Sequence, residues 1–178
     1  MRIAIVIVAS MLASAWAQDI KMPASFDKLA AKAEESVDVT LDSNMLQLAG
    51  KFLSGNDADQ AKAKKIVGGL KGIYVRSLEF AKEGEYSVAD VDAVRAQLQA
   101  PAWSRIVGVA SKGGSKDEVY FKTSAGARIG GLVIIALEPK ELTIVSISGA
   151  ISVDDLADLG GQFGIPKVEL PKGKGKEQ

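Results

Sequence analysis

The stretch from Trp103 to Ala150 most constrains the fold of this chain, because turn signals divide it into short runs rich in β-branched and aromatic residues. Gly113-Gly114 and Ala125-Gly126 are typical of tight turns, and Pro139 lies in a third turn signal. Four strands joined by hairpins are therefore predicted, over residues 103–110, 118–123, 128–137 and 142–150. The third run is apolar nearly throughout, which indicates a central strand covered on both faces.

The part of the chain before Trp103 adds two strands and most of the helices. Alternating apolar and polar residues predict a strand over 37–41, and β-branched and aromatic residues predict another over 73–80. Helical spacing of apolar residues predicts helices over 45–52 and 59–70. Three more helices are predicted to begin at Ser25, Ser87 and Ser152. The sum is an α+β domain, a mainly antiparallel sheet of about five strands with helices packed on one face.

Each predicted helix has an apolar face, which we expect to be buried against the sheet. The stripes are Phe26, Leu29, Ala30 and Ala33; Met45, Leu48, Ala49 and Phe52; Ala63, Ile66, Val67 and Leu70; Val88, Val91, Val94 and Leu98; and Val153, Leu156, Leu159 and Phe163. Ser25 is a predicted N-cap, and Ser87 with Asp90 is a predicted capping box.

The first 17 residues have the features of a secretory signal peptide. Arg2 precedes an apolar run from Ile3 to Ala9, and Ala15-Trp16-Ala17 forms a small-x-small cleavage site before Gln18. The apolar run is too short to cross a bilayer. We therefore expect cleavage between Ala17 and Gln18 and a periplasmic or secreted product, without a lipid anchor because no cysteine follows.

The remaining chain is expected to form one α+β domain over residues 18–165. Residues 166–178 hold two prolines, two glycines and the four lysines Lys167, Lys172, Lys174 and Lys176. Such a segment buries too little apolar surface to offset the entropy of ordering, so a disordered tail is predicted. A weak contact between these lysines and an anionic surface is a further expectation.

The composition excludes several classes of function. The chain contains no cysteine and no histidine. This excludes the usual zinc and copper sites, which depend on these residues, and the mechanisms of hydrolysis that need a histidine. Without the leader, the chain has 21 cationic and 22 acidic residues. A nucleic-acid-binding domain normally has an excess of cationic residues, so this class is not favoured. No cofactor is implied by any motif.

The order of these elements resembles the bacterial family known as domain of unknown function 4252. The segments that carry the resemblance are residues 37–41, 45–46, 52–53, 72–76, Trp103, 130–134 and 142–151, with Asp154, Leu156 and Leu159. The resemblance covers about residues 26–163 and implies an exported or lipid-anchored envelope protein of α+β fold without an established activity. It also implies a place in envelope sensing, through genes that neighbour extracytoplasmic sigma and anti-sigma factors.

Two sets of motif fragments could carry chemistry. Ser25-x-x-Lys28 and Lys122-Thr123-Ser124 are similar to two motifs of penicillin-recognising enzymes, but the middle Ser-Asp-Asn element is missing and a helix cap explains Ser25. The glycine-rich segments 68–72 and 112–115 contain lysine, as phosphate-binding loops do. Neither has Walker spacing, and a hairpin turn explains the second.

Acidic and aromatic residues supply the other candidates. Asp57 with Asp59, Asp90 with Asp92, and Asp154 with Asp155 and Asp158 could bind calcium, although each group lies at a predicted helix start where an acid stabilises the helix. Two carboxylates in a cleft could cleave glycosides, and the candidates are Glu79, Asp117, Glu118 and Glu138. Tyr74, Tyr86, Trp103 and Tyr120 could form an aromatic surface, or they are core and rim residues of the sheet, which we favour.

No residue is assigned to a catalytic, cofactor or metal site. The preferred hypothesis is a non-catalytic envelope domain that binds a protein partner through an open sheet edge or an exposed sheet face. A carrier of small ligands, with a pocket between helices and sheet, is the alternative. A hydrolase based on acids or serine ranks last.

Overall fold

The computed structural model of the protein describes residues 20–53, 58–124 and 128–152. The predicted signal peptide, the helix predicted to begin at Ser152 and the predicted tail over 166–178 lie outside the described residues.

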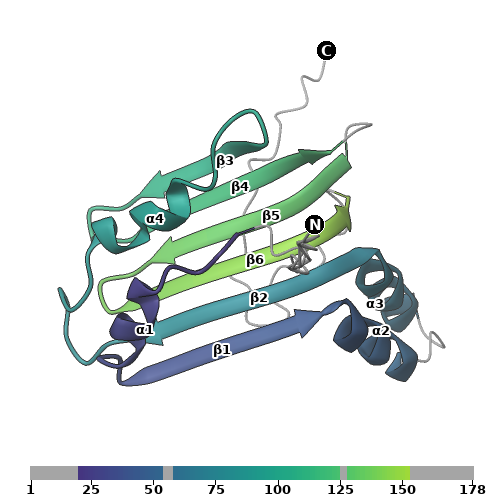
Figure 1. Ribbon diagram of the computed structural model, residues 1–178, viewed down its shortest axis with the longest axis horizontal. Helices are drawn as coiled ribbons and strands as arrows, with labels where there is room; N and C mark the ends of the chain where they lie inside the picture. The colour runs from purple at the N-terminus through teal and green to yellow at the C-terminus, as the bar shows by residue number, and fades with distance from the viewer. Residues whose placement is uncertain (1–19, 54–57, 125–127, 153–178) are drawn as a thin grey trace, which may run out of the picture.

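Six antiparallel strands form one sheet in the order β1-β2-β6-β5-β4-β3 (Figure 1). The strands are β1 (Glu35–Asp42), β2 (Leu70–Glu79), β3 (Trp103–Ala110), β4 (Lys116–Ser124), β5 (Arg128–Leu137) and β6 (Glu141–Ile151). The α+β class and the C-terminal meander β3–β6 are confirmed, with six strands where about five were expected. The meander returns β6 beside β2, so the two halves of the chain share one continuous sheet.

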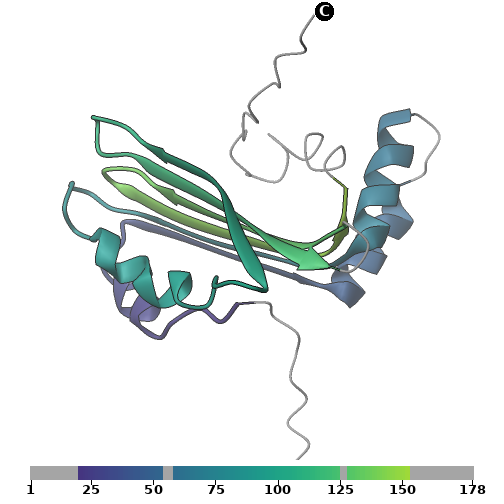
Figure 2. The ribbon, with the colours of Figure 1, turned by 90° about the horizontal axis from the view of Figure 1, so that it is seen from above.

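The helices are short and lie on both sides of the sheet. They are α1 (Ser25–Ala30), α2 (Ser43–Phe52), α3 (Ala58–Gly69), the 3₁₀ turn η1 (Val88–Val91) and α4 (Asp92–Arg95). Helices α1 and α4 cover one face, whereas α2 and α3 rise on the opposite side, beside the end of the sheet where β1 ends and β2 begins (Figure 2). The expected packing on one face therefore holds for α1, η1 and α4 and not for α2 and α3.

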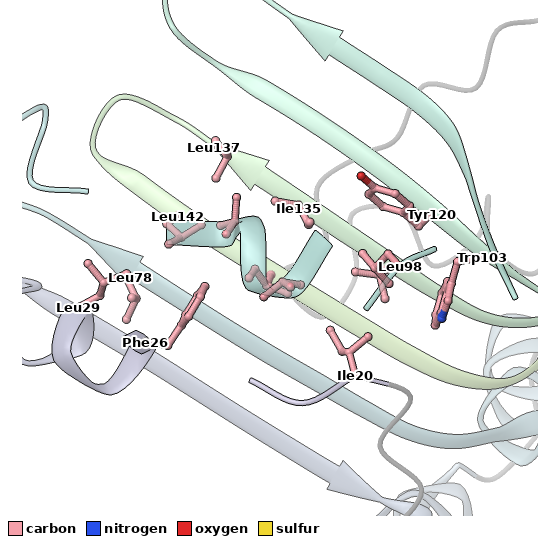
Figure 3. Packing of buried hydrophobic residues seen from close by; sticks show 14 of the residues in the cluster. Ile20, Phe26, Leu29, Leu78, Leu98, Trp103, Tyr120, Ile135, Leu137 and Leu142 are labelled. Atoms are coloured by element: carbon pink, nitrogen blue, oxygen red, sulfur yellow. The ribbon is translucent and has the colours of Figure 1, made fainter. Parts of the chain in front are cut away.

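The main core lies between the sheet and α1, η1 and α4, on what we call the first face. Phe26 and Leu29 of α1 are buried next to Leu78 of β2, while Trp103 and Tyr120 close the other end of the cluster (Figure 3). Val91 and Val94 are fully buried in the same cluster. Burial of each such side chain contributes about 1.5–3 kcal/mol, which fixes these short helices although they would not be stable alone.

A second cluster lies on the opposite, second face of the sheet. It joins Leu46 of α2 and Val67 of α3 to strand residues that include Leu132, Ile134 and Val145. Strand β5 contributes to both clusters, since Val133 and Ile135 belong to the first face. The prediction of a central strand covered on both faces is confirmed.

Two helix starts differ in how well local signals predicted them. Ser87 and Asp90 form the predicted capping box, with the Ser87 N–H donating to Asp90 Oδ2 at 2.7 Å. The predicted N-cap at Ser25 is wrong, because Ala24 occupies that position without a side-chain hydrogen bond and Ser25 is already helical. Val88 is also not buried as its spacing predicted, since it is 40% exposed at the start of η1.

Strands β2 and β6 approach each other closely at the end next to α3. Gly149 has a φ of +133°, and a Cβ atom there would lie 2.5 Å from the Gly69 carbonyl oxygen. The register between the two strands shifts between Leu70 and Gly72, directly opposite. A glycine is required here because the bulge leaves no room for a side chain.

Candidate functional site

The two edges of the sheet differ in charge. The β1 edge carries Glu35, Asp38 and Asp42, and Asp38 forms an ion pair with Arg76 of β2. Arg76 Nη2 also lies 3.0 Å from Asp27 Oδ1 of α1. Charged side chains on an edge strand discourage pairing with another chain, so β1 is a protected edge.

The β3 edge is open and nearly uncharged. Arg105 is the one charged residue of the strand, whereas Ile106 and Val109 are 52% and 54% exposed. A bulge leaves Ile106 without a partner on β4, because the register shifts between Arg105 and Val107. Beyond the bulge, Val107–Ala110 pairs regularly with β4, and no strand among the described residues pairs with its other side, which suits an added strand.

The candidate aromatic surface does not form. Trp103 and Tyr120 are buried in the first-face core, and Lys122 Nζ lies 5.8 Å from the centre of the Trp103 ring. Tyr86 stacks on Phe80 and donates its hydroxyl to the carbonyl oxygens of Glu138 and Glu141. Burial, and then the charges of Glu138 and Glu141, raise the pKa of Tyr86 to about 12. The preferred interpretation is confirmed for Trp103 as a core residue, and Tyr74 is half-buried on β2.

Glu118 is held in a structural ion pair on the first face. Arg95 of α4 donates from Nε and Nη2 to its two carboxylate oxygens at 3.1 and 3.0 Å, and the Tyr120 hydroxyl donates at 2.7 Å. Burial alone would raise the pKa of Glu118, but the hydrogen bonds from Arg95 and Tyr120 and the charges of Arg95 and Arg105 bring the pKa below its ordinary value. A carboxylate held ionised in this way suits anchoring of α4 rather than proton transfer.

Asp117 and Glu138 are the two candidate carboxylates that the structure brings together. Burial and the charge of Glu138 raise the pKa of Asp117. Glu138 in turn accepts a hydrogen bond from Ser115 Oγ at 2.7 Å. Glu79 is exposed at the end of β2, opposite Glu35 and Glu141. The four candidate carboxylates therefore do not share one site. Glu118 and Asp117 are neighbours on β4, so their side chains point to opposite faces of the sheet.

Some of the other predicted motifs have structural explanations, whereas Asp57, Asp154, Asp155 and Asp158 lie outside the described residues. Residues 112–115 form the β3–β4 turn, in which the Ser111 N–H donates to the Ser115 carbonyl at 2.9 Å. Asp90 belongs to the capping box, and Asp92 in the first turn of α4 pairs with Arg95 at 2.9 Å. Within the described ranges, no group of three or more acidic side chains could hold a metal ion.

The alternative hypothesis placed a pocket between helices and sheet, and the structure has a cavity between α2 and α3, next to the start of β2. Its volume is about 410 Å³, and Leu46, Val67 and Leu70 give it apolar walls. Lys51 and Lys64 also line it, one from each helix. Only the pairing of two helices creates this space, so no local motif could have indicated it.

The geometry defines an α+β protein built on a six-strand antiparallel sheet, with one open edge strand and a helix pair at the sheet's end. A family model described as "Domain of unknown function (DUF4252)" matches residues 26–159. This chain therefore belongs to the DUF4252 family. Neither curated proteins nor solved structures gave a significant match.

Proposed function

We propose that this protein is a non-catalytic domain of the cell envelope that binds an extended segment of a protein partner along β3. The observation that carries the proposal is the contrast between the two sheet edges. β1 is protected by acids, whereas β3 exposes Ile106 and Val109 on an edge that no other described strand pairs with. Addition of a strand to such an edge gives affinity through backbone hydrogen bonds and specificity through alternate side chains.

The placement of the polar residues supports a non-catalytic role. Glu118 and Arg95 neutralise each other, Asp117 lies on the sheet face that the described α1, η1 and α4 do not cover, and Glu138 lies in the turn between β5 and β6. General acid-base catalysis by two carboxylates needs a cleft that holds the substrate between them. The predicted signal peptide supports a location outside the cytoplasm. A domain that binds a protein partner there suits a role in envelope sensing.

The test is site-specific photo-cross-linking in living cells, with the cross-linking amino acid at Val109 of β3 or at Val37 of β1. Val37 is the matched control, because it is a valine on the other edge strand and is 39% exposed. We expect one reproducible adduct from position 109 and none of the same mass from position 37. The change Val109→Lys should abolish the adduct formed from position 106, because a lysine on the edge opposes strand addition.

Several results would contradict the proposal. Equal adducts from both edges, or no specific adduct from positions 106 and 109, would show that β3 is not a docking edge. Hydrolysis of envelope substrates by the purified mature protein at enzyme-like rates would overturn the non-catalytic role. Detection of an uncleaved chain in the cytoplasm would overturn the envelope location.

A carrier of small ligands is the second candidate, and the cavity between α2 and α3 is the observation that favours it. Apolar walls with Lys51 and Lys64 suit an amphiphile that has one anionic group. Native mass spectrometry of protein isolated from its own periplasm should then show a bound ligand, which Val67→Trp would displace by filling the cavity. Recovery of ligand-free protein would exclude this candidate.

A further inference from the structure

Helix α2 presents its apolar stripe to solvent. Met45, Leu48 and Phe52 follow one another at intervals of three and four residues, so they form one line along the helix. They are 49%, 47% and 81% exposed. For a chain of this size, an almost fully exposed phenylalanine in line with two other large apolar side chains forms an exposed apolar patch of the kind that marks a binding surface.

The opposite side of α2 makes the contacts with the rest of the protein. Leu46 is buried in the second-face cluster, and the Cβ position of Gly50 lies 3.9 Å from Val67 Cγ1 of α3. On a helix of 3.6 residues per turn, Leu46 and Gly50 point well away from the line of Met45, Leu48 and Phe52. The stripe is therefore turned away from α3, and no rearrangement of the helix pair is needed to reach it.

The helix pair also carries more lysines than acids. Its exposed lysines are Lys51, Lys62, Lys64 and Lys65, whereas its acids are Asp59 within α3 and Asp42 at the N-cap of α2. The whole chain has equal numbers of cations and acids, so this end is basic relative to the remainder. Lys51 lies on α2 itself and the other three lysines lie on the neighbouring α3, and lysines close to a helix with an exposed apolar stripe favour an anionic bilayer surface as its partner.

We propose that the α2–α3 pair docks on an anionic phospholipid surface, with Met45, Leu48 and Phe52 of α2 entering the headgroup boundary and the lysines of the two helices adding electrostatic attraction to the phosphates. Among the described helices none is long and apolar enough to cross a membrane. A second copy of this chain is a poorer occupant. A stable dimer buries about 800 Å² on each partner, more than three side chains of one ten-residue helix supply, and two lysine-rich ends would repel.

The first test is flotation of the full mature chain with vesicles. Phosphatidylcholine vesicles that contain about one third phosphatidylglycerol should carry the protein upward, whereas pure phosphatidylcholine should not, and added salt should weaken the association. The double change Leu48→Ser and Phe52→Ser should lower the bound fraction by roughly tenfold or more, since it removes the apolar contact.

Two full-length control variants separate the helix pair from other surfaces. Ile106→Ser with Val109→Ser removes the exposed apolar residues of β3 and should bind vesicles as the wild type does. Replacement of Lys167, Lys172, Lys174 and Lys176 by serine should leave most of the binding intact. Absence of flotation by the wild type, or binding that is lost in the tail variant and kept in the Leu48→Ser/Phe52→Ser variant, would overturn the proposal.

A second measurement tests the proposal even if the Leu48→Ser/Phe52→Ser variant folds poorly. The chain has no cysteine, so Phe52→Cys introduces a single site for an environment-sensitive fluorophore, and Val109→Cys is its matched control. A blue shift on anionic vesicles at position 52 alone is expected. Equal shifts at both positions, or none at position 52, would show that α2 does not enter the interface, and a shift produced only by added envelope proteins would assign the stripe to a protein partner.

Discussion

Glu118 shows how a single carboxylate connects a helix to the sheet in this fold. It lies on β4, and its bidentate pair with Arg95 fixes α4 over the first face, 23 residues away along the chain. The carboxylate of Glu118 and the guanidinium of Arg95 retain only 12% and 19% exposure, so solvent screens this pair less than an exposed one. Removal of one member leaves the other partly buried without a counter-charge, which is the costly outcome.

We predict that Glu118→Gln lowers the free energy of unfolding by about 1–3 kcal/mol at neutral pH. The folded-state pKa of Glu118 lies below its ordinary value of 4.5. The ionised group therefore stabilises the protein above the unfolded-state pKa, and that contribution is lost as pH falls through the lower folded-state value. The difference between wild type and variant should accordingly shrink below about pH 4.5 in denaturant unfolding.

Glu79→Gln is the matched control for this prediction. Glu79 is also a strand glutamate, but it is exposed at the end of β2, so its substitution should change stability by less than about 0.5 kcal/mol. A Glu118→Gln variant as stable as the Glu79→Gln variant at neutral pH would contradict the structural role assigned to the Arg95 pair.

The same residues mark a limit of prediction from sequence. Glu118 and Asp117 were predicted together as candidate acids, because a pattern of residues carries no information on their partners. Their separation to opposite faces follows from the alternation of side chains along a strand, once the extent of β4 is known. The pairing with Arg95 depends on tertiary contacts between α4 and β4, which no local signal encodes. Ser87 with Asp90 was predictable because a capping box spans only three residues.

At the scale of elements, strands were predicted more accurately than the burial of helices. The bounds of β3 and β5 agree with the predicted runs, because β-branched residues and flanking turns are local signals. Helix α2 was also predicted, but its buried side was wrong. The spacing of Met45, Leu48 and Phe52 reports that one face is apolar, and it does not report whether this protein or another surface covers that face.

We predict that Leu46→Ala and Leu48→Ala, two residues apart on α2, differ sharply in their effect on stability. Leu46 is 3% exposed in the second-face cluster, so its truncation should cost about 2–5 kcal/mol. Leu48 is 47% exposed, and its truncation should change the free energy of unfolding by less than about 0.5 kcal/mol. Urea unfolding of both variants gives the comparison. Equal losses would mean that the stripe is buried within the folded chain, which would remove the basis for membrane docking.

At the scale of the whole molecule, the two proposed surfaces lie at opposite edges of the sheet. β3 forms one edge, and α2 follows directly from β1, which forms the other (Figure 1). Strands β2, β6, β5 and β4 lie between them. A protein that docks on a membrane through α2 and α3 would thus hold β3 away from the lipid, where it could pair with a partner segment.

We therefore predict that the two surfaces act independently. Sites without shared contacts usually contribute additively to free energies, and four strands separate these two. Val109→Lys should reduce cross-linking to the partner in living cells and leave vesicle flotation of the purified protein unchanged. Leu48→Ser with Phe52→Ser should reduce flotation and leave the cross-linking unchanged. In the variant that combines all three changes, the loss of cross-linking should equal that of Val109→Lys. The loss of flotation should equal that of Leu48→Ser with Phe52→Ser. Loss of flotation in Val109→Lys would instead indicate that β3 and the helix pair contact the same surface, and a single partner or lipid face spanning the sheet would then replace the two-surface arrangement.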